Sequence, residues 1–214
     1  MACPPAETTR REAQREERRC AILKVARQAF HDQGYGGTTM SGIAATLGGS
    51  KGTLWAYFAS KEELFAATMD ALVEEFAPFF VLDPAKPFAA ALIDYCTDFL
   101  TMMLTDAVLA LNRLVIAEAP RFPELGRIFY ERAPKRRQGV LATHLEERIR
   151  AGDMRPVDPH LASAQLHHLC QSRLFILSLW GVKGAISAAE IRQEAIATTE
   201  LFLNGYGSET SRTR

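Results

Sequence analysis

The chain has 214 residues, of which 48% are hydrophobic, and 25 Lys and Arg residues balance 25 Asp and Glu residues. A chain of this length buries a full core, and two subdomains fit within it. The formal net charge of zero by itself argues against a nucleic-acid-binding protein.

The charge, however, is unevenly distributed. Between Arg10 and Lys61, nine Lys and Arg accompany four Asp and Glu, which leaves 16 bases and 21 acids for the rest of the chain. A basic front and an acidic rear are typical of a protein that binds DNA at one end only.

No targeting signal is visible. The N-terminus is polar, and the longest apolar run, Leu174 to Val182, is broken by Ser178 and is too short to span a bilayer. The four cysteines are scattered without a C-x-x-C pair, which is typical of a reduced, cytoplasmic protein: Cys3, Cys20, Cys96 and Cys170. Redox sensing and a role as buried or incidental thiols both remain open.

We expect residues 1–9 to form a disordered tail and a helix to begin at about Arg10. Ile22, Ala26 and Phe30 repeat every four residues, and Gly34 followed by Tyr35 is typical of a helix C-terminus. Upstream, four arginines alternate with glutamates: Arg11, Arg15, Arg18 and Arg19 with Glu12, Glu16 and Glu17. A solvated charged face and a phosphate-contacting arm are both open interpretations.

Two short helices follow, joined by a glycine turn. The first helix has an apolar stripe at helical spacing, formed by Met40, Ile43, Ala44 and Leu47. Thr39 is its expected N-cap, and Gly48 is expected to end it in the left-handed conformation. Ser50 then caps a helix from Lys51 to about Phe58, in which Leu54 and Phe58 face inward. This pattern predicts a helix-turn-helix, although an ordinary corner of an all-helical domain fits the periodicity equally well.

The outer faces of the second short helix favour the helix-turn-helix interpretation. They carry Lys51, Thr53, Trp55 and Tyr57, side chains that suit phosphate oxygens and base edges better than a protein core.

Beyond this point every segment reads as helix, so we predict an all-α fold. An S-x-x-E capping box at Ser60–Glu63 opens a helix that ends before Pro78. Further helices are predicted at residues 88–104, 106–119, 123–151 with a kink at Pro134, 159–180, and from the Ser187 cap to 204.

At this point the sequence resembles a known family. The residues Gly34-Tyr35, Thr38-Thr39, Ile43-Ala44, Ser50 to Phe58 and Ser60-Lys61-Glu62 resemble the DNA-binding domain of the TetR/AcrR family of bacterial transcriptional regulators. The resemblance covers roughly residues 15–65 (Arg15–Phe65). Three residues depart from the family pattern: Trp55 stands where Tyr is usual, Gly49 where a small branched residue is usual, and Gly42 where an acidic residue is frequent.

The resemblance implies which residues contact double-stranded DNA. Thr53, Trp55, Tyr57 and Lys61 would contact phosphates, and Lys51, Gly52 and Trp55 would approach bases. The complete predicted set is Thr39, Ser50, Lys51, Gly52, Thr53, Trp55, Tyr57 and Lys61.

The rear of the chain resembles AcrR-like C-terminal domains more loosely, over Asn112 to Asp158. This resemblance implies a small-molecule effector and a homodimer. Candidate effector contacts are aromatic residues and polar residues with apolar neighbours: Phe76, Tyr95, Phe99, Met103, Asn112, Arg113, Gln171 and Phe175. Each one also fits a core or a dimer contact. The aromatic lining favours an apolar or aromatic compound, and Arg113 favours a carboxylate on it.

The last two helices carry apolar stripes beyond what one domain needs. Paired across a twofold axis, they predict a homodimer interface and therefore a palindromic operator; the candidate residues are Leu161, Ala164, Leu169, Ile191, Ala195 and Leu203.

Other chemistry finds little support. His167 and Cys170 share a helix face but supply only two of the ligands that a zinc site needs. No phosphate loop or hydrolase motif is present, so we expect no enzyme activity, no metal and no cofactor.

The sequence thus predicts a tail (1–9), a DNA-binding domain (10–65), an effector-binding and dimerisation domain (66–205) and a second tail (206–214). The predicted function is a dimeric, cytoplasmic DNA-binding regulator without a membrane partner, most simply a repressor released by a ligand. An all-helical ligand-binding or interaction module with a structural helix-turn-helix is the alternative.

Overall fold

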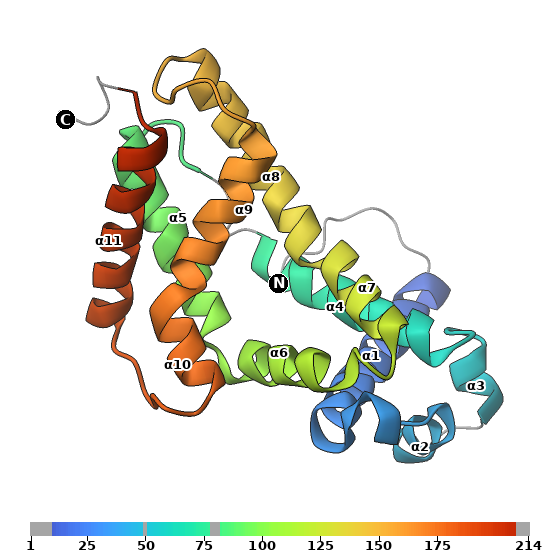
Figure 1. Cartoon of the computed structure of the whole chain (residues 1–214). Coiled ribbons are helices and arrows are strands. Elements are labelled where there is room, and N and C mark those ends of the chain that lie inside the picture. The colour runs from blue at the N-terminus through green and yellow to red at the C-terminus, as the bar shows by residue number, and fades with distance from the viewer. Residues whose placement is uncertain (1–9, 49–50, 78–81, 209–214) are drawn as a thin grey trace. The chain divides into compact units, whose positions relative to one another are not determined.

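The computed structural model describes residues 10–48, 51–77 and 82–208, with the side chain of Lys51 left out. Throughout these ranges the regular elements are helices (Figure 1). The predicted all-α class is therefore confirmed. One isolated antiparallel bridge joins Met154 to Gly207.

The chain forms two compact units. Unit 1 contains the residues up to Glu75 together with Arg113–Ala133, and unit 2 contains Phe76–Asn112 and the residues from Pro134 onward. This division differs from the predicted boundary at residue 65, because a segment from the middle of the chain packs with the N-terminal helices.

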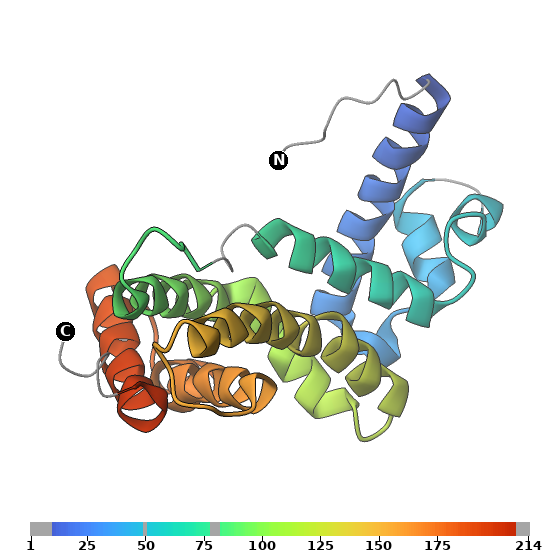
Figure 2. The ribbon, with the colours of Figure 1, turned by 90° about the horizontal axis from the view of Figure 1, so that it is seen from above.

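Unit 1 is built on α1 (Arg10–Gly37), α2 (Met40–Thr46), α3 (Lys51–Trp55) and α4 (Lys61–Phe76). The end of α6 (Asp106–Glu118) and α7 (Pro123–Arg132) complete it. The apolar stripe of α1 packs on α4 through an aromatic cluster: the Phe30 and Phe65 ring centroids are 5.3 Å apart, and those of Tyr35 and Phe65 are 5.5 Å apart. Figure 2 shows α4 crossing α1.

Unit 2 contains α5 (Phe88–Met103), α8 (Pro134–Arg150), α9 (Pro159–Cys170), the π-helix η2 (Gln171–Phe175), α10 (Ile176–Leu179) and α11 (Ala188–Tyr206). α11 packs along both α5 and α9, and α8 packs along α9 (Figure 1). Their buried faces form one continuous core that includes Leu92, Phe99, Leu166 and Phe202.

Three predicted boundaries need correction. α3 ends at Trp55 rather than Phe58, because Tyr57 N–H bonds the Leu54 carbonyl three residues back and tightens the last turn. The predicted helix 159–180 is interrupted by the π-helix η2. α11 runs to Tyr206, and Ser208 N–H bonds the Asp153 carbonyl, so residues 206–208 do not belong to a tail.

Other predicted boundaries hold. Pro134 separates two helices, and Ser187 with Glu190 forms the expected capping box. The tail residues 1–9 and 209–214 lie outside the described residues.

Within the described ranges, no single helix is long and apolar enough to cross a membrane. α5 and α6 together have the required length and composition, but the chain bends by 69° between them.

Candidate nucleic-acid interface and effector region

The two ends of α2 have the features that the sequence predicts. The Thr39 hydroxyl accepts a hydrogen bond from Gly42 N–H at 3.0 Å and caps α2. Gly48 follows the helix with φ 65°, and a Cβ there would meet no atom within 4 Å. Gly48 is therefore needed for its backbone conformation and not for close packing.

Of the predicted contact residues, Gly52, Thr53 and Trp55 lie on α3, and Tyr57 follows it. Leu54 and Phe58 are buried, whereas Gly52 is exposed and Thr53 and Tyr57 are half-buried. Trp55, a large apolar side chain, is 40% exposed. Gly49 and Ser50 lie outside the described residues, as does the side chain of Lys51.

The start of α4 is capped in a slightly different way from the prediction. Glu63 N–H donates to the Ser60 hydroxyl at 3.1 Å, and the Glu63 carboxylate accepts from Ala59 N–H at 2.8 Å instead of from Ser60 N–H. The N–H groups of Glu63 and Ala59 are the two backbone donors satisfied by this arrangement.

Lys61 has an internal partner. Its ammonium donates to the Tyr35 carbonyl at 2.8 Å and lies 4.1 Å from the centroid of the Tyr35 ring. Lys61 therefore ties α4 to the end of α1, and a phosphate contact has to compete with this bond or share the remaining donors of the ammonium.

A carboxylate from far along the chain holds the same turn. Glu118 accepts from Tyr35 N–H at 2.8 Å and from Gly36 N–H at 2.6 Å. Gly34, with φ 73°, turns these two N–H groups toward the carboxylate. Phe122 packs edge-on against the Tyr35 ring at 5.3 Å. The sequence did not indicate this role for Glu118, although the residue lies within the stretch from Asn112 to Asp158 that carries the looser resemblance.

Arginines of α1 lie near the residues that follow α3. The Arg15 guanidinium is 5.9 Å from the Tyr57 ring centroid, and the Arg19 guanidinium is 6.0 Å from the Phe58 ring centroid. Arg19 also pairs with Glu16 at 3.5 Å.

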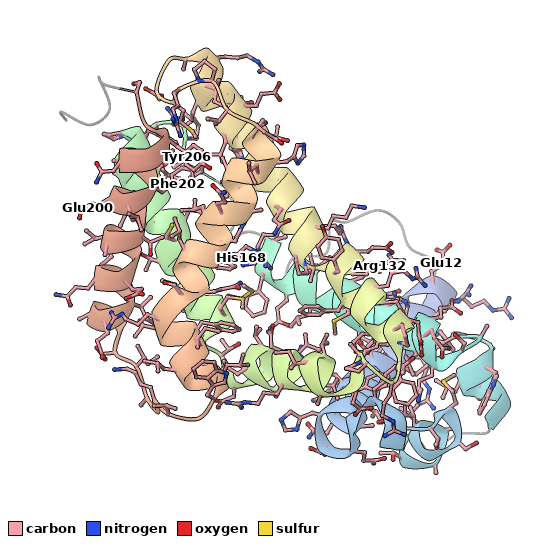
Figure 3. All side chains as sticks on the ribbon, viewed as in Figure 1. Glu12, Arg132, His168, Glu200, Phe202 and Tyr206 are labelled. Atoms are coloured by element: carbon pink, nitrogen blue, oxygen red, sulfur yellow. The ribbon has the colours of Figure 1, made fainter. Side chains whose placement is uncertain are left out.

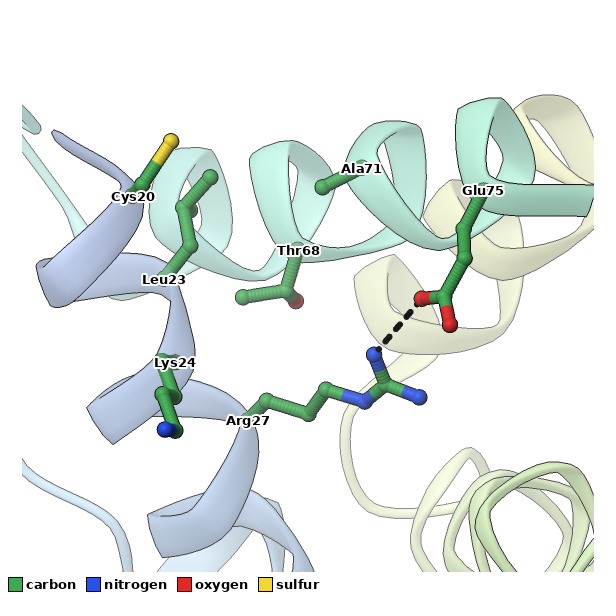
Figure 4. A pocket seen from close by; sticks show the side chains of 7 residues that line it. All are labelled: Cys20, Leu23, Lys24, Arg27, Thr68, Ala71 and Glu75. Carbon is green, nitrogen blue, oxygen red and sulfur yellow. Dashed lines mark hydrogen bonds and ion pairs between the residues drawn. The ribbon is translucent and has the colours of Figure 1, made fainter. Parts of the chain in front are cut away.

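A separate groove of about 230 Å³ lies between α1 and α4 (Figure 4). Leu23, Thr68 and Ala71 line it, and the Arg27–Glu75 ion pair, 3.3 Å long, closes one end. Cys20 also lines this groove. Burial raises the pKa of the Cys20 thiol, and the Glu16 carboxylate adds to that rise, so less thiolate is present for oxidation.

The predicted effector residues are divided between the two units. Tyr95, Phe99, Met103 and Phe175 are buried in the core of unit 2. Phe76 packs against that core and Gln171 opens the π-helix. The Asn112 amide donates to the Val108 carbonyl of its own helix, and Arg113 is exposed in unit 1.

A polar group lies within this core. His167 Nδ1 is 2.8 Å from the Ser163 carbonyl, which can only accept, so Nδ1 carries the proton of the neutral ring. The Tyr95 hydroxyl then donates to His167 Nε2 at 2.7 Å. The Arg137 guanidinium lies 4.9 Å from the Phe99 ring centroid, and the ring of Phe99 lies 4.8 Å from that of His167.

The environment sets the protonation of this group. Burial, with a further contribution from the Arg137 charge, lowers the pKa of His167 to about 3. Burial raises the pKa of Tyr95 above its usual range. At neutral pH the pair is therefore a neutral imidazole and a neutral phenol. Sequence reasoning considered His167 only as a metal ligand and missed Arg137.

The predicted dimer residues do not share one surface. Ile191, Ala195 and Leu203 are buried in the core of unit 2, so their apolar area is already covered within one chain. This corrects the sequence assignment. Leu161 is 53% exposed, and Ala164 and Leu169 are half-buried. On α11 the exposed large apolar residue is Leu201, at 59%. His168 on α9 and Glu200 on α11, both exposed, are labelled in Figure 3.

In the parts of the chain that the structure describes, no three His, Cys, Asp or Glu side chains lie close enough together to hold a metal ion.

The helices α2 and α3, joined through Gly48, form a helix-turn-helix in unit 1, which we call the reading motif. Together with the larger helical unit 2, this arrangement is that of a helix-turn-helix transcriptional regulator. Residues 22–68 match the family described as bacterial regulatory proteins, tetR family. Residues 90–208 match the AefR-like transcriptional repressor C-terminal domain. The chain belongs to the TetR family of transcriptional regulators.

Solved structures and curated proteins agree with this assignment. The flavonoid-responsive regulator FrrA is 31% identical with a TM-score of 0.80, and the match covers 91% of this chain and 99% of FrrA. A putative TetR-family regulator from Mesorhizobium loti is 29% identical with a TM-score of 0.78, covering 94% and 100% of the two chains. The regulator HbdR of an Aromatoleum species is 24% identical over 90% of this chain and 83% of its own.

Proposed function

We propose that the protein is a homodimeric, cytoplasmic repressor that binds a palindromic operator and is released by a small aromatic ligand. The observation that supports the DNA-binding part most directly is the motif α2–Gly48–α3. Its inward residues are buried, while Trp55 remains 40% exposed beside Thr53 and Tyr57. An aromatic side chain left uncovered next to hydroxyl groups suits the phosphates and base edges of a duplex.

The ligand part rests on the group Tyr95, Phe99, Arg137 and His167. Aromatic faces, one phenol, one imidazole and one guanidinium converge inside an apolar core. A few polar groups on apolar walls are the usual composition of a small-molecule site. The arrangement suits an aromatic compound carrying a phenol or a carboxylate, and the similar regulator FrrA is described as flavonoid-responsive.

The dimer part rests on the exposed apolar residues of the last helices. Leu161 on α9 and Leu201 on α11 remain more than half exposed within one chain. A twofold pair of these helices would cover them and place two reading motifs on successive half-sites, about 34 Å apart.

The test measures binding of purified protein to a duplex selected from a random pool, with a scrambled duplex as the reference. We expect Trp55→Ala and Tyr57→Ala to weaken binding to the selected duplex, whereas Tyr130→Ala, which removes an exposed ring on α7, leaves it unchanged. Equal affinity of the wild type for selected and scrambled duplexes would contradict the proposal.

Ligand release is measured separately, with quercetin as a flavonoid and benzoate as a simple aromatic carboxylate. We expect at least one of them to lower operator affinity by about 5- to 150-fold, the range of ordinary allosteric coupling. Tyr95→Phe should reduce this response while the affinity without ligand stays the same, because Tyr95 belongs to unit 2. A full response in Tyr95→Phe would place the ligand elsewhere.

A further inference from the structure

The first three turns of α1 carry arginines that lie outside the reading surface described above. Arg11, Arg15 and Arg19 are four residues apart, Arg18 precedes Arg19 directly, and Ile22 continues this side of the helix into the core. We call these four residues the arginine row. They lie on the same side of α1 as Ile22, N-terminal to the buried part of that helix.

The arginine row leads to the end of α3. Arg15 lies over the Tyr57 ring at 5.9 Å, and Arg19 lies over the Phe58 ring at 6.0 Å. A shallow surface depression of about 580 Å³ joins the two elements and is lined by Arg11, Glu12, Gln14, Arg15 and Tyr57. Tyr57 thus belongs both to the proposed reading surface and to this depression.

The charge of the segment is positive. Arg10 to Arg19 contains five arginines and three glutamates. Glu16 is engaged by Arg19 at 3.5 Å, whereas Arg11 and Arg15 are exposed on the surface. A planar guanidinium held against an aromatic ring keeps its outward N–H groups available for an anion.

We propose that Arg11 and Arg15 bind backbone phosphates of duplex DNA next to the base pairs that α3 reads. This inference rests on the proposed function, since it extends the same DNA contact by one further strip of surface. Arg15 is placed by Tyr57, and Arg11 lies one helical turn, about 6 Å, further along α1. Contacts of this kind add affinity and fix the orientation of the reading motif without reading sequence.

The experiment measures the salt dependence of binding to the selected duplex and to a scrambled duplex. We compare the wild type with Arg11→Gln/Arg15→Gln and with Arg127→Gln/Lys135→Gln, a control that removes two exposed charges on α7 and α8. Each lost phosphate contact lowers the slope of log Kobs against log salt by about 0.9. The expected result is a slope smaller by about two in the first variant and unchanged in the control. The affinity of the first variant should fall by the same factor on both duplexes.

A second variant separates charge from packing. Arg11→Lys/Arg15→Lys keeps both charges, and we expect it to retain the wild-type slope. Loss of the slope in this variant as well would assign the effect to the packing of Arg15 on Tyr57 and overturn the proposal. A wild-type slope in the Gln variant would overturn it too. If the wild type fails to prefer the selected duplex, the proposed function itself fails, which is a different outcome.

Discussion

The carboxylate of Glu118 is bound to the backbone of Tyr35, 83 residues earlier in the chain, at 2.8 Å. The same carboxylate accepts from Gly36 N–H, so two backbone donors released by the turn at Gly34 are satisfied together. This pair of hydrogen bonds connects the end of α6 to the end of α1, just before α2.

We therefore expect Glu118→Gln to destabilise unit 1. Hydrogen bonds to a charged partner contribute about 1.5–3 kcal/mol each, and the amide accepts more weakly, so the free energy of unfolding should fall by about 1–3 kcal/mol. Urea unfolding in a Trp180→Phe background measures this, because Trp55 is then the remaining tryptophan and lies in unit 1. Glu131→Gln, which removes an exposed carboxylate paired with Arg127, is the control. Equal midpoints for both variants would contradict this account.

A second prediction separates backbone strain from close packing at Gly34. Gly34 and Gly152 both have positive φ, at 73° and 81°. An added Cβ at Gly34 would lie 2.3 Å from Glu118 Oε1, whereas at Gly152 it would meet nothing within 4 Å. Gly152→Ala should lower the free energy of unfolding by about 1–2 kcal/mol, the penalty of the left-handed conformation.

Gly34→Ala should lower it further, because a φ of 73° with a ψ of 172° is adopted essentially by glycine alone and because the carboxylate has to move as well. The double variant Gly34→Ala/Glu118→Ala tests the cause. The double variant should lose less free energy of unfolding than the sum of the losses in Gly34→Ala and Glu118→Ala, because the clash is absent once the carboxylate is removed. If the losses in the free energy of unfolding are additive, the Glu118 carboxylate does not clash with the added Cβ.

The third prediction concerns pH. The folded protein holds the pKa of His167 at about 3, well below its ordinary value of 6.5. The unfolded chain therefore binds this proton at higher pH than the folded chain, and stability is lost as pH falls from about 6.5 toward 3. The loss contributed by one such group is at most about 1.4 kcal/mol per pH unit.

His167→Gln should remove that part of the pH dependence, whereas His160→Gln, an exposed residue on α9, should not. Urea unfolding at a series of pH values between neutral and mildly acidic measures the slope. An unchanged slope in His167→Gln would contradict the assignment of a neutral, buried imidazole.

A fourth prediction tests the dimer face. Leu161→Glu/Leu201→Glu places two charges on the exposed apolar positions of α9 and α11 and should convert the proposed dimer into monomers, because a charge buried in an interface without a partner is strongly unfavourable. Val140→Glu, a 48% exposed residue on α8, is the matched control and should leave the dimer intact. Light scattering at micromolar concentration measures the mass. A dimer that survives the double substitution would place the interface on another surface.

Local features were predictable because they depend on residues close together in the chain. Thr39 and Gly48 delimit α2 through a cap and a positive φ, and Ser187 with Glu190 starts α11, whatever the rest of the protein does. The inward positions Leu54 and Phe58 likewise followed from their spacing. The short α3 did not follow, because the tightened turn after Trp55 depends on hydrogen bonds that compete closely with those of a longer helix.

Tertiary structure alone decided which of several suitable residues meet. The amphipathic pattern of α11 could not tell a core from an interface, since both bury apolar area, and packing placed Ile191, Ala195 and Leu203 in the core. The bond between Glu118 and Tyr35 has no local signal, because a carboxylate can satisfy any exposed N–H pair that the fold brings to it. The sequence by itself determined the all-helical class, the caps of α2 and α11 and the inward positions of α3, because these depend on neighbouring residues. Long-range packing determined that Glu118 holds the end of α1 just before α2 and that Arg15 lies beside Tyr57.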